Sequence, residues 1–277
     1  MRLSISNIAW DPAEDEAVAA LLNARAIDAI DIAPGKYFPD PAATTDAEIA
    51  RVRGRWRARG IDIVGMQALL FGTTGLNLFG PAPVQDAMLA HLAAVCRIGA
   101  GLGATRLVFG SPRNRDRTGL SDEQAVQAAL PFLGRLGDIA ADCGVIVCLE
   151  PNPVCYGANF MTATPETASV VSQLGHRSIR MQFDTGALAI NGEDAGTEMG
   201  RYAALIGHIH ASEPDLLPLG DGATDHASAA AAIAAALPSH IVTVEMLATR
   251  VEPHVQAVAR ALDVALRHYR GSRASHG

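Results

Sequence analysis

The sequence predicts an α/β protein built as a single (β/α)8 barrel. The chain has 277 residues, a length typical of such a barrel in one domain. Short apolar runs alternate along it with longer amphipathic segments, and no linker or low-complexity stretch divides the series. Runs that are apolar throughout are typical of parallel strands covered on both faces. The alternation therefore predicts a parallel sheet enclosed by helices.

Eight apolar runs are the predicted strands. They are residues 3–10, 29–33, 61–68, 106–110, 145–150, 179–184, 206–210 and 241–245. Between them, helical periodicity predicts helices at residues 86–101, 122–143 and 165–174, and the alanine-rich residues 229–236 favour another. We assign residues 1–270 to the barrel and expect residues 271–277 to form a short disordered tail.

Capping residues mark several of the helix ends. Ser121 precedes an acidic first turn, and Pro165 occupies the first helical position after a threonine. Gly60, Gly144 and Gly175 stand where the preceding helices should stop, as glycine does at helix C-termini. A doubly wound open sheet is the alternative fold. It would need a glycine-rich phosphate loop after an early strand, which the first strand lacks.

Composition excludes several classes of function. The net charge of −7 argues against nucleic-acid binding, because phosphates require a basic surface. No apolar run approaches the roughly twenty residues that a membrane-spanning helix needs. The four cysteines form no CxxC pair, and the first residues lack the apolar stretch of a signal peptide. We therefore expect a cytoplasmic protein.

Four consecutive predicted strands end on a side chain that can bind a metal, namely Glu150, Asp184, His210 and Glu245. Strand ends meet at one mouth of a barrel, so we expect these groups at one level on one side of it. A single acid there is commonly a helix cap, but three adjacent carboxylates would repel one another without a divalent cation. This donor set favours one Mn²⁺, with Mg²⁺, Co²⁺ and Zn²⁺ as alternatives. His208 is interpreted as a core histidine.

The residues around these positions resemble a known family. The matching segments are Glu150-Pro151-Asn152-Pro153, Phe183-Asp184-Thr185-Gly186, His208-Ile209-His210-Ala211-Ser212-Glu213 and Val244-Glu245. Through them the whole chain resembles the xylose isomerase-like barrels. More narrowly, it resembles the sugar phosphate isomerase/epimerase group with the D-tagatose 3-epimerase-like enzymes and inosose dehydratases. The resemblance implies one divalent metal ion held by Glu150, Asp184, His210 and Glu245, with the two glutamates as acid and base. It is also the ground for expecting a homodimer.

The implied activity is isomerisation or epimerisation of a small sugar or cyclitol by proton transfer beside a carbonyl, through an enediolate. A metal-dependent dehydratase of a keto-sugar or inosose would use the same base and metal, and is the alternative. Two further hypotheses stay open. One is a metal-free hydrolase that uses Glu150 and Glu245, and the other is a non-catalytic sugar-binding barrel.

Two positions depart from the family pattern. Ala187 stands where the family has a histidine, three residues after Asp184, and the segment 212–217 lacks the arginine that follows the seventh strand. Both groups bind substrate oxygens in the family. The resemblance therefore supports the metal ligands of this chain more strongly than it supports a particular substrate. Related endonuclease barrels hold three zinc ions with additional histidines. The second, third and fourth predicted strands end without one, which argues against DNA repair.

Five further residues are expected to contact the substrate, namely Lys36, Gln67, Asn152, Tyr156 and His226. All five follow or end a predicted strand on the side where a barrel carries its chemistry. Lys36 is the one lysine of the chain, which favours a role beyond a solvated loop. Asn152 could equally form a turn, and His226 could be a bystander of a helix cap.

Overall fold

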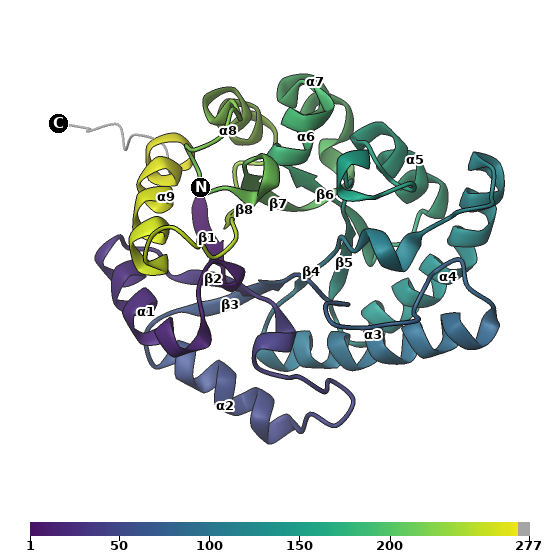
Figure 1. The fold of residues 1–277 in the computed structure, drawn as a ribbon, viewed down its shortest axis with the longest axis horizontal. Coiled ribbons are helices and arrows are strands. Elements are labelled where there is room, and N and C mark those ends of the chain that lie inside the picture. The colour runs from purple at the N-terminus through teal and green to yellow at the C-terminus, as the bar shows by residue number, and fades with distance from the viewer. Residues whose placement is uncertain (271–277) are drawn as a thin grey trace.

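The computed structural model describes residues 1–270 and shows a closed barrel of eight parallel strands (Figure 1). The strands are β1 (Arg2–Ser6), β2 (Ala29–Ile32), β3 (Asp62–Met66), β4 (Arg106–Phe109), β5 (Ile146–Leu149), β6 (Ile179–Asp184), β7 (Ile206–Ser212) and β8 (Ile241–Glu245). β8 closes the barrel on β1, where Leu3 pairs with Val242. The predicted fold class is therefore confirmed. The predicted tail, residues 271–277, lies outside the described residues.

Helices surround the barrel and alternate with its strands (Figure 1). They are α1 (Asp15–Ala24), α2 (Asp46–Arg57), α3 (Ala82–Leu102), α4 (Asp122–Asp142), α5 (Thr164–Leu174), α6 (Thr185–Asn191), α7 (Ala195–Tyr202), α8 (His226–Ala236) and α9 (His254–Tyr269). The connection from β6 to β7 holds two of them, α6 and α7. At the seam of the barrel α9 packs beside α1, which joins the two ends of the described chain.

The first strand is shorter than predicted. It ends at Ser6, where the chain enters a 3₁₀ turn at Asn7–Ala9, and Ser6 Oγ accepts a hydrogen bond from the Ile8 amide. The apolar run continues to Trp10 because that side chain is buried outside the strand. Its ring packs edge-on against Trp56 of α2, with ring centroids 6.5 Å apart. Apolarity past the strand end thus reflects packing of a turn against a helix.

The predicted caps agree with the structure except at Pro165, which is the second residue of α5 because the helix begins at Thr164. Ser121 Oγ accepts the amide of Gln124 at 3.3 Å at the start of α4, which satisfies a donor that has no partner within the helix. Gly60, Gly144 and Gly175 have φ angles of 73°, 70° and 59°. Glycine adopts this left-handed conformation without the steric cost that a Cβ imposes. Each one ends a helix and lets the chain turn into the next strand.

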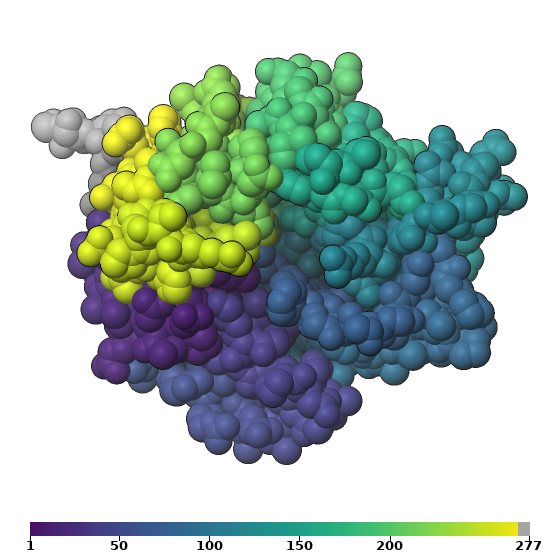
Figure 2. Space-filling view, in the orientation of Figure 1, coloured from purple at the N-terminus to yellow at the C-terminus, as the bar shows by residue number. Residues whose placement is uncertain are grey.

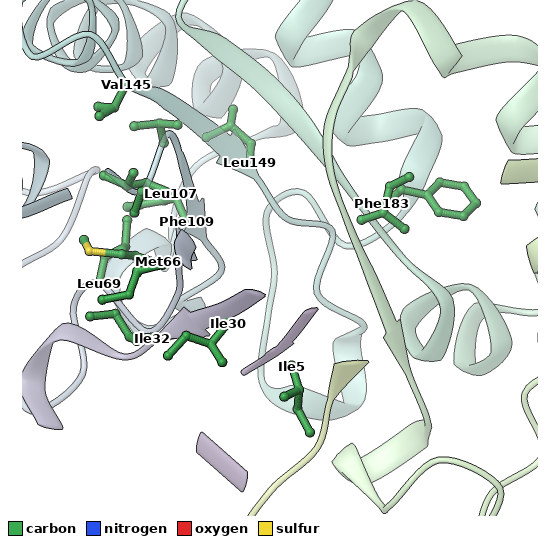
Figure 3. Packing of buried hydrophobic residues seen from close by; sticks show 14 of the residues in the cluster. Ile5, Ile30, Ile32, Met66, Leu69, Leu107, Phe109, Val145, Leu149 and Phe183 are labelled. Carbon is green, nitrogen blue, oxygen red and sulfur yellow. The ribbon is translucent and has the colours of Figure 1, made fainter. Parts of the chain in front are cut away.

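One continuous apolar core joins the strands to the helices. Figure 3 shows part of it, with Ile30 and Ile32 of β2 near Met66 of β3, and Leu107 and Phe109 of β4 beside them. All five are buried, and a buried side chain of this size stabilises the fold by about 1.5–3 kcal/mol. Packing of this density fixes the strands, so the residues at their carboxyl ends are held by a rigid frame.

Candidate active site

Four side chains with metal-binding atoms converge at the carboxyl ends of the last strands. Glu150 follows β5, Asp184 ends β6, His210 lies in β7 and Glu245 ends β8. Nδ1 of His210 lies 3.0 Å from Oε2 of Glu245, 3.8 Å from Oε1 of Glu150 and 3.9 Å from Oδ2 of Asp184. One donor atom from each residue lies within 4.8 Å of all the others. The structure brings the four candidate ligands together.

The strand register staggers these groups from one strand to the next. Asp184 pairs with His210, but Glu245 pairs with Ser212, two residues further along β7. Because strands in a closed barrel are tilted, a stagger of this kind does not separate the groups along the barrel axis, and their donor atoms lie within 4.8 Å of one another. His210 is wholly buried, whereas the acids keep a small exposed fraction. The imidazole thus lies at the bottom of the site, below the three carboxylates.

Each carboxylate is held by a neighbouring side chain. The pairs, donor first, are Asn152 with Glu150, Gln67 with Glu245 and Ser212 with Asp184. Asn152 Nδ2 lies 3.0 Å from Oε2 of Glu150, whose Oε1 faces His210. Likewise Gln67 binds Oε1 of Glu245, whose Oε2 faces His210. Each glutamate therefore offers one oxygen to the centre of the site while the other is fixed from outside.

A glycine makes room for one of these acids. At Gly110, just after β4, any Cβ would overlap the carboxylate of Glu150. The φ angle of Gly110 is not among the positive ones, so alanine could adopt the backbone conformation. The absence of a side chain is therefore what this position needs, and it allows the carboxylate of Glu150 to approach the backbone.

Burial and mutual repulsion shift the titration of the acids. Burial, with the charges of Glu245 and Asp184 adding to it, raises the pKa of Glu150 to about 8. Burial and the charge of Glu245 raise the pKa of Asp184 to about 6. Burial would also raise the pKa of Glu245, but the charge and hydrogen bond of His210 lower it below its usual value. The acids repel one another, and a cation would relieve that repulsion.

The donor geometry fits a single divalent cation. Two atoms that bind one cation at about 2.1 Å lie between about 3 Å apart, when at right angles, and about 4.2 Å apart, when opposite. The three distances from His210 Nδ1, 3.0 to 3.9 Å, fall within that range. Three carboxylates and one imidazole form a donor set suited to Mn²⁺, Mg²⁺, Co²⁺ or Zn²⁺. The residues present therefore fit a mononuclear metal centre.

A second buried cluster lies beneath the first. Oδ2 of Asp31 in β2 lies 2.6 Å from Nε2 of His208 and 3.9 Å from Nε2 of His210. Ser4 Oγ donates to Asp31 Oδ1 at 3.4 Å, and a Cβ at Gly65 would overlap the carboxylate. His208 is buried, which agrees with its interpretation as a core histidine. Asp31, the partner of His208, was not predicted as a site residue. An acid inside the apolar run 29–33 is nevertheless a signal of a buried polar contact.

A cavity of about 740 Å³ opens above the three acids and the histidine. Glu150, Asp184 and Glu245 line its floor, and loops after the strands form its sides. Figure 2 shows a hollow near the middle of the face seen there. This volume lies within the range of about 300–1,000 Å³ that is typical of small-molecule sites.

Four of the five expected substrate contacts line this cavity: Lys36, Gln67, Asn152 and Tyr156. Nζ of Lys36 donates to the carbonyl oxygens of Asn7, at 2.7 Å, and of Trp10. It therefore holds the loop after β1 and keeps one hydrogen for a ligand. The hydroxyl oxygen of Tyr156 accepts the amide of Asp215 at 2.7 Å, so this side chain also ties two loops together.

His226 lies behind the cavity wall and does not line it. Its Nδ1 lies 2.7 Å from the hydroxyl of Tyr269, and its Nε2 lies 3.0 Å from Oε1 of Glu213. Glu213 does line the cavity, and it also accepts the amides of Gly220 and Thr224. Burial opposes its ionisation, but the hydrogen bond from His226 and the two amides lower the pKa of Glu213 to about 2. Sequence reasoning singled out the histidine and missed the carboxylate that it supports.

Among residues 1–270, none of the helices combines the length and the apolar character that a bilayer crossing requires. The closed parallel barrel defines an α/β protein of the (β/α)8 class, with a candidate metal site of four donor residues at its mouth. The sequence comparison specifies the family. The model of the xylose isomerase-like TIM barrels matches residues 18–268, and the chain belongs to this family.

Three solved structures with the same fold are described by their similarity to this chain. D-psicose 3-epimerase from Clostridium cellulolyticum H10, in complex with D-tagatose, has a TM-score of 0.80 at 17% identity, over 97% of this chain and 99% of that chain. The 3-keto-D-glucoside 4-epimerase YcjR of E. coli has a TM-score of 0.76 at 15% identity, over 95% and 98%. The IolI protein with a bound zinc atom has a TM-score of 0.75 at 16% identity, over 97% and 98%. No curated protein matches the chain by sequence.

Proposed function

We propose that the protein is a divalent-metal-dependent isomerase or epimerase that moves a proton beside the carbonyl of a sugar or cyclitol. The observation that carries this proposal is the convergence of Glu150, Asp184, His210 and Glu245, with donor atoms within 4.8 Å, on the floor of a cavity of about 740 Å³. The structural neighbours support it, since two of those described are sugar epimerases and one contains zinc.

The two glutamates are the proposed acid and base. The bound cation would polarise two neighbouring substrate oxygens and stabilise negative charge on them. Glu245, held on one oxygen by Gln67, takes the proton from carbon as a carboxylate. Glu150, held on one oxygen by Asn152, returns a proton on the other side of the substrate.

Two amide groups are the proposed substrate contacts on the floor. Oε1 of Gln67 and Oδ1 of Asn152 are buried and accept no hydrogen bond within residues 1–270. Leaving a buried acceptor unpaired costs about 1–3 kcal/mol, so a ligand hydroxyl that donates to it recovers that free energy. Both side chains line the cavity, and their NH₂ groups already bind the catalytic glutamates. They thus connect substrate hydroxyls to the acid and the base.

The identity of the ion and the cellular context remain predictions. Three carboxylates with one imidazole favour Mn²⁺, with Mg²⁺, Co²⁺ and Zn²⁺ as alternatives. A cytoplasmic location and a homodimer also remain predictions from the sequence.

The test combines metal analysis with proton exchange. We expect about one equivalent of a divalent metal per chain by plasma mass spectrometry, lost in Asp184→Asn. In D₂O, NMR of ketohexoses and inososes should show deuterium entering beside the carbonyl, and Glu245→Gln should abolish this exchange. Glu123→Gln, an exposed change on α4, is the control. Exchange that survives exhaustive chelation would contradict the proposal. Loss of one water from the product would instead favour the dehydratase.

A further inference from the structure

The cavity is polar at its floor and apolar at its mouth. Four large side chains from three loops and one turn line the outer part, namely Phe71, Tyr156, Leu216 and Leu247, and we call them the apolar wall. Phe71 is 86% exposed, Leu247 50% and Tyr156 39%. Single exposed apolar residues are common on protein surfaces, but several that line one cavity mark a binding site.

The apolar wall is built by hydrogen bonds between loops that follow different strands. The Tyr156 hydroxyl after β5 accepts the amide of Asp215 after β7, at 2.7 Å. The amide of Leu247 after β8 donates to the carbonyl oxygen of Leu216, at 2.9 Å. These bonds hold the Tyr156, Leu216 and Leu247 loops in one arrangement. The wall is therefore organised before any ligand arrives.

The turn that carries Leu216 is strained. Asp215 and Leu216 have φ angles of 59° and 53°, in the left-handed region that costs a residue with a Cβ about 1–3 kcal/mol. Glycine or asparagine would adopt this conformation more easily than leucine, so the turn itself does not require Leu216. What Leu216 contributes is its side chain, which lines the cavity. The strain is maintained by the hydrogen bonds on either side of it.

Many polar groups of the cavity already have partners within the protein. Lys36 binds two carbonyl oxygens and keeps one hydrogen, Ser111 donates to Asn114 at 2.5 Å, and the oxygens of Glu213 accept two amides and a histidine. The unpaired acceptors of Gln67 and Asn152 lie next to the catalytic glutamates instead. A free sugar that carries a hydroxyl on every carbon would place some of them against the apolar wall without partners, which is costly.

The cavity is also large for a monosaccharide. At about 740 Å³ it is in the upper part of the range for sites that bind drug-sized molecules. A single six-membered sugar ring on the floor would leave the apolar wall uncovered. The volume and the lining of the cavity therefore both favour a substrate with a polar end and an apolar end.

We propose that the substrate is a keto-sugar that carries a bulky apolar substituent, of the aryl or alkyl glycoside class. The sugar lies on the floor at Glu150 and Glu245, and the substituent packs on the apolar wall. This inference rests on the proposed function for the orientation of the sugar. The wall itself is a property of the cavity and can be tested by binding alone.

The test compares the affinities of two glycosides by calorimetry, with and without added Mn²⁺. Methyl and phenyl β-D-glucopyranoside carry the same sugar, and neither has a carbonyl, so binding is read without turnover. Burying a phenyl group on apolar side chains should make the phenyl glycoside bind about tenfold or more tightly. In Leu247→Ser that ratio should fall to about twofold or less. Val251→Ser is the control, since Val251 is 94% exposed and lies outside the cavity lining.

Two results would overturn the inference. One is equal affinity for the two glycosides, or no binding of the phenyl glycoside at millimolar concentration. The other is a dimer, seen by analytical ultracentrifugation, that Phe71→Ser dissociates, because a second copy would then cover the wall. Failure of the proposed function is a separate result. It appears as absence of bound metal and of deuterium exchange, and the ratio of affinities does not depend on either.

Discussion

Nε2 of His208 lies 2.6 Å from Oδ2 of Asp31, and the same oxygen lies 3.9 Å from Nε2 of His210. That atom of His210 is buried and has no hydrogen-bond partner within residues 1–270. Its other ring nitrogen, Nδ1, faces the three carboxylates. A histidine that binds metal through one nitrogen is oriented by a partner of the other, and here Asp31 is the nearest carboxylate.

The first prediction concerns this carboxylate. Asp31→Asn should weaken metal binding by about tenfold, because it removes the negative charge 3.9 Å from Nε2 that makes the His210 ring a better ligand. The measurement is the dissociation constant for Mn²⁺ by calorimetry. Asp142→Asn, an exposed change at the end of α4, is the matched control. An Asp31→Asn protein that is folded by circular dichroism and binds Mn²⁺ like the wild type would contradict this role.

The second prediction concerns pH. Glu150, with its pKa raised to about 8, and Asp184, raised to about 6, are partly protonated at neutral pH without metal. A cation must displace these protons, so Mn²⁺ affinity should rise steeply from about pH 6 to about pH 9. The raised pKa values also make the metal-free fold less stable as pH rises through this window. The increase in melting temperature on adding Mn²⁺ should therefore grow with pH.

Calorimetry in two buffers of different ionisation enthalpy checks this prediction directly. The difference in observed enthalpy gives the number of protons released per metal bound, which should be positive near pH 7. Affinity that is flat across the window, with no proton release, would show that the acids are already ionised before metal arrives.

The sequence predicts that the four candidate ligands converge, but it does not predict the apolar wall of the cavity, and the difference has a physical reason. Each of the four candidate ligands stands at the end of an apolar run, and barrel geometry carries strand ends to one place. Asp31 and His208 meet across the barrel, between β2 and β7, so their contact depends on which residues point inward. The apolar wall depends on loop conformations, such as the left-handed φ of Leu216, that no periodicity encodes.

The third prediction concerns Gln67, whose amide donates to Glu245. Gln67→Met keeps the size of the side chain but removes this hydrogen bond and the acceptor offered to the substrate. Since a hydrogen bond to a charged group contributes about 1.5–3 kcal/mol, kcat/KM for proton exchange should fall by about ten- to a hundredfold or more. Metal content should remain at about one equivalent, because the four ligands are retained. Loss of metal together with activity would instead assign Gln67 a role in building the centre.

The last prediction uses Gly110, where a Cβ would overlap the carboxylate of Glu150. Gly110→Ala should displace Glu150, so that metal affinity and exchange activity both fall by about tenfold or more while the barrel remains folded. Gly134→Ala is the matched control. Gly134 lies inside α4, and a Cβ there would meet only Leu174 at 3.9 Å, so alanine should stabilise the helix by about 0.4–1 kcal/mol. Equal effects of the two substitutions would mean that Glu150 can move without loss, and its place as a metal ligand would no longer stand.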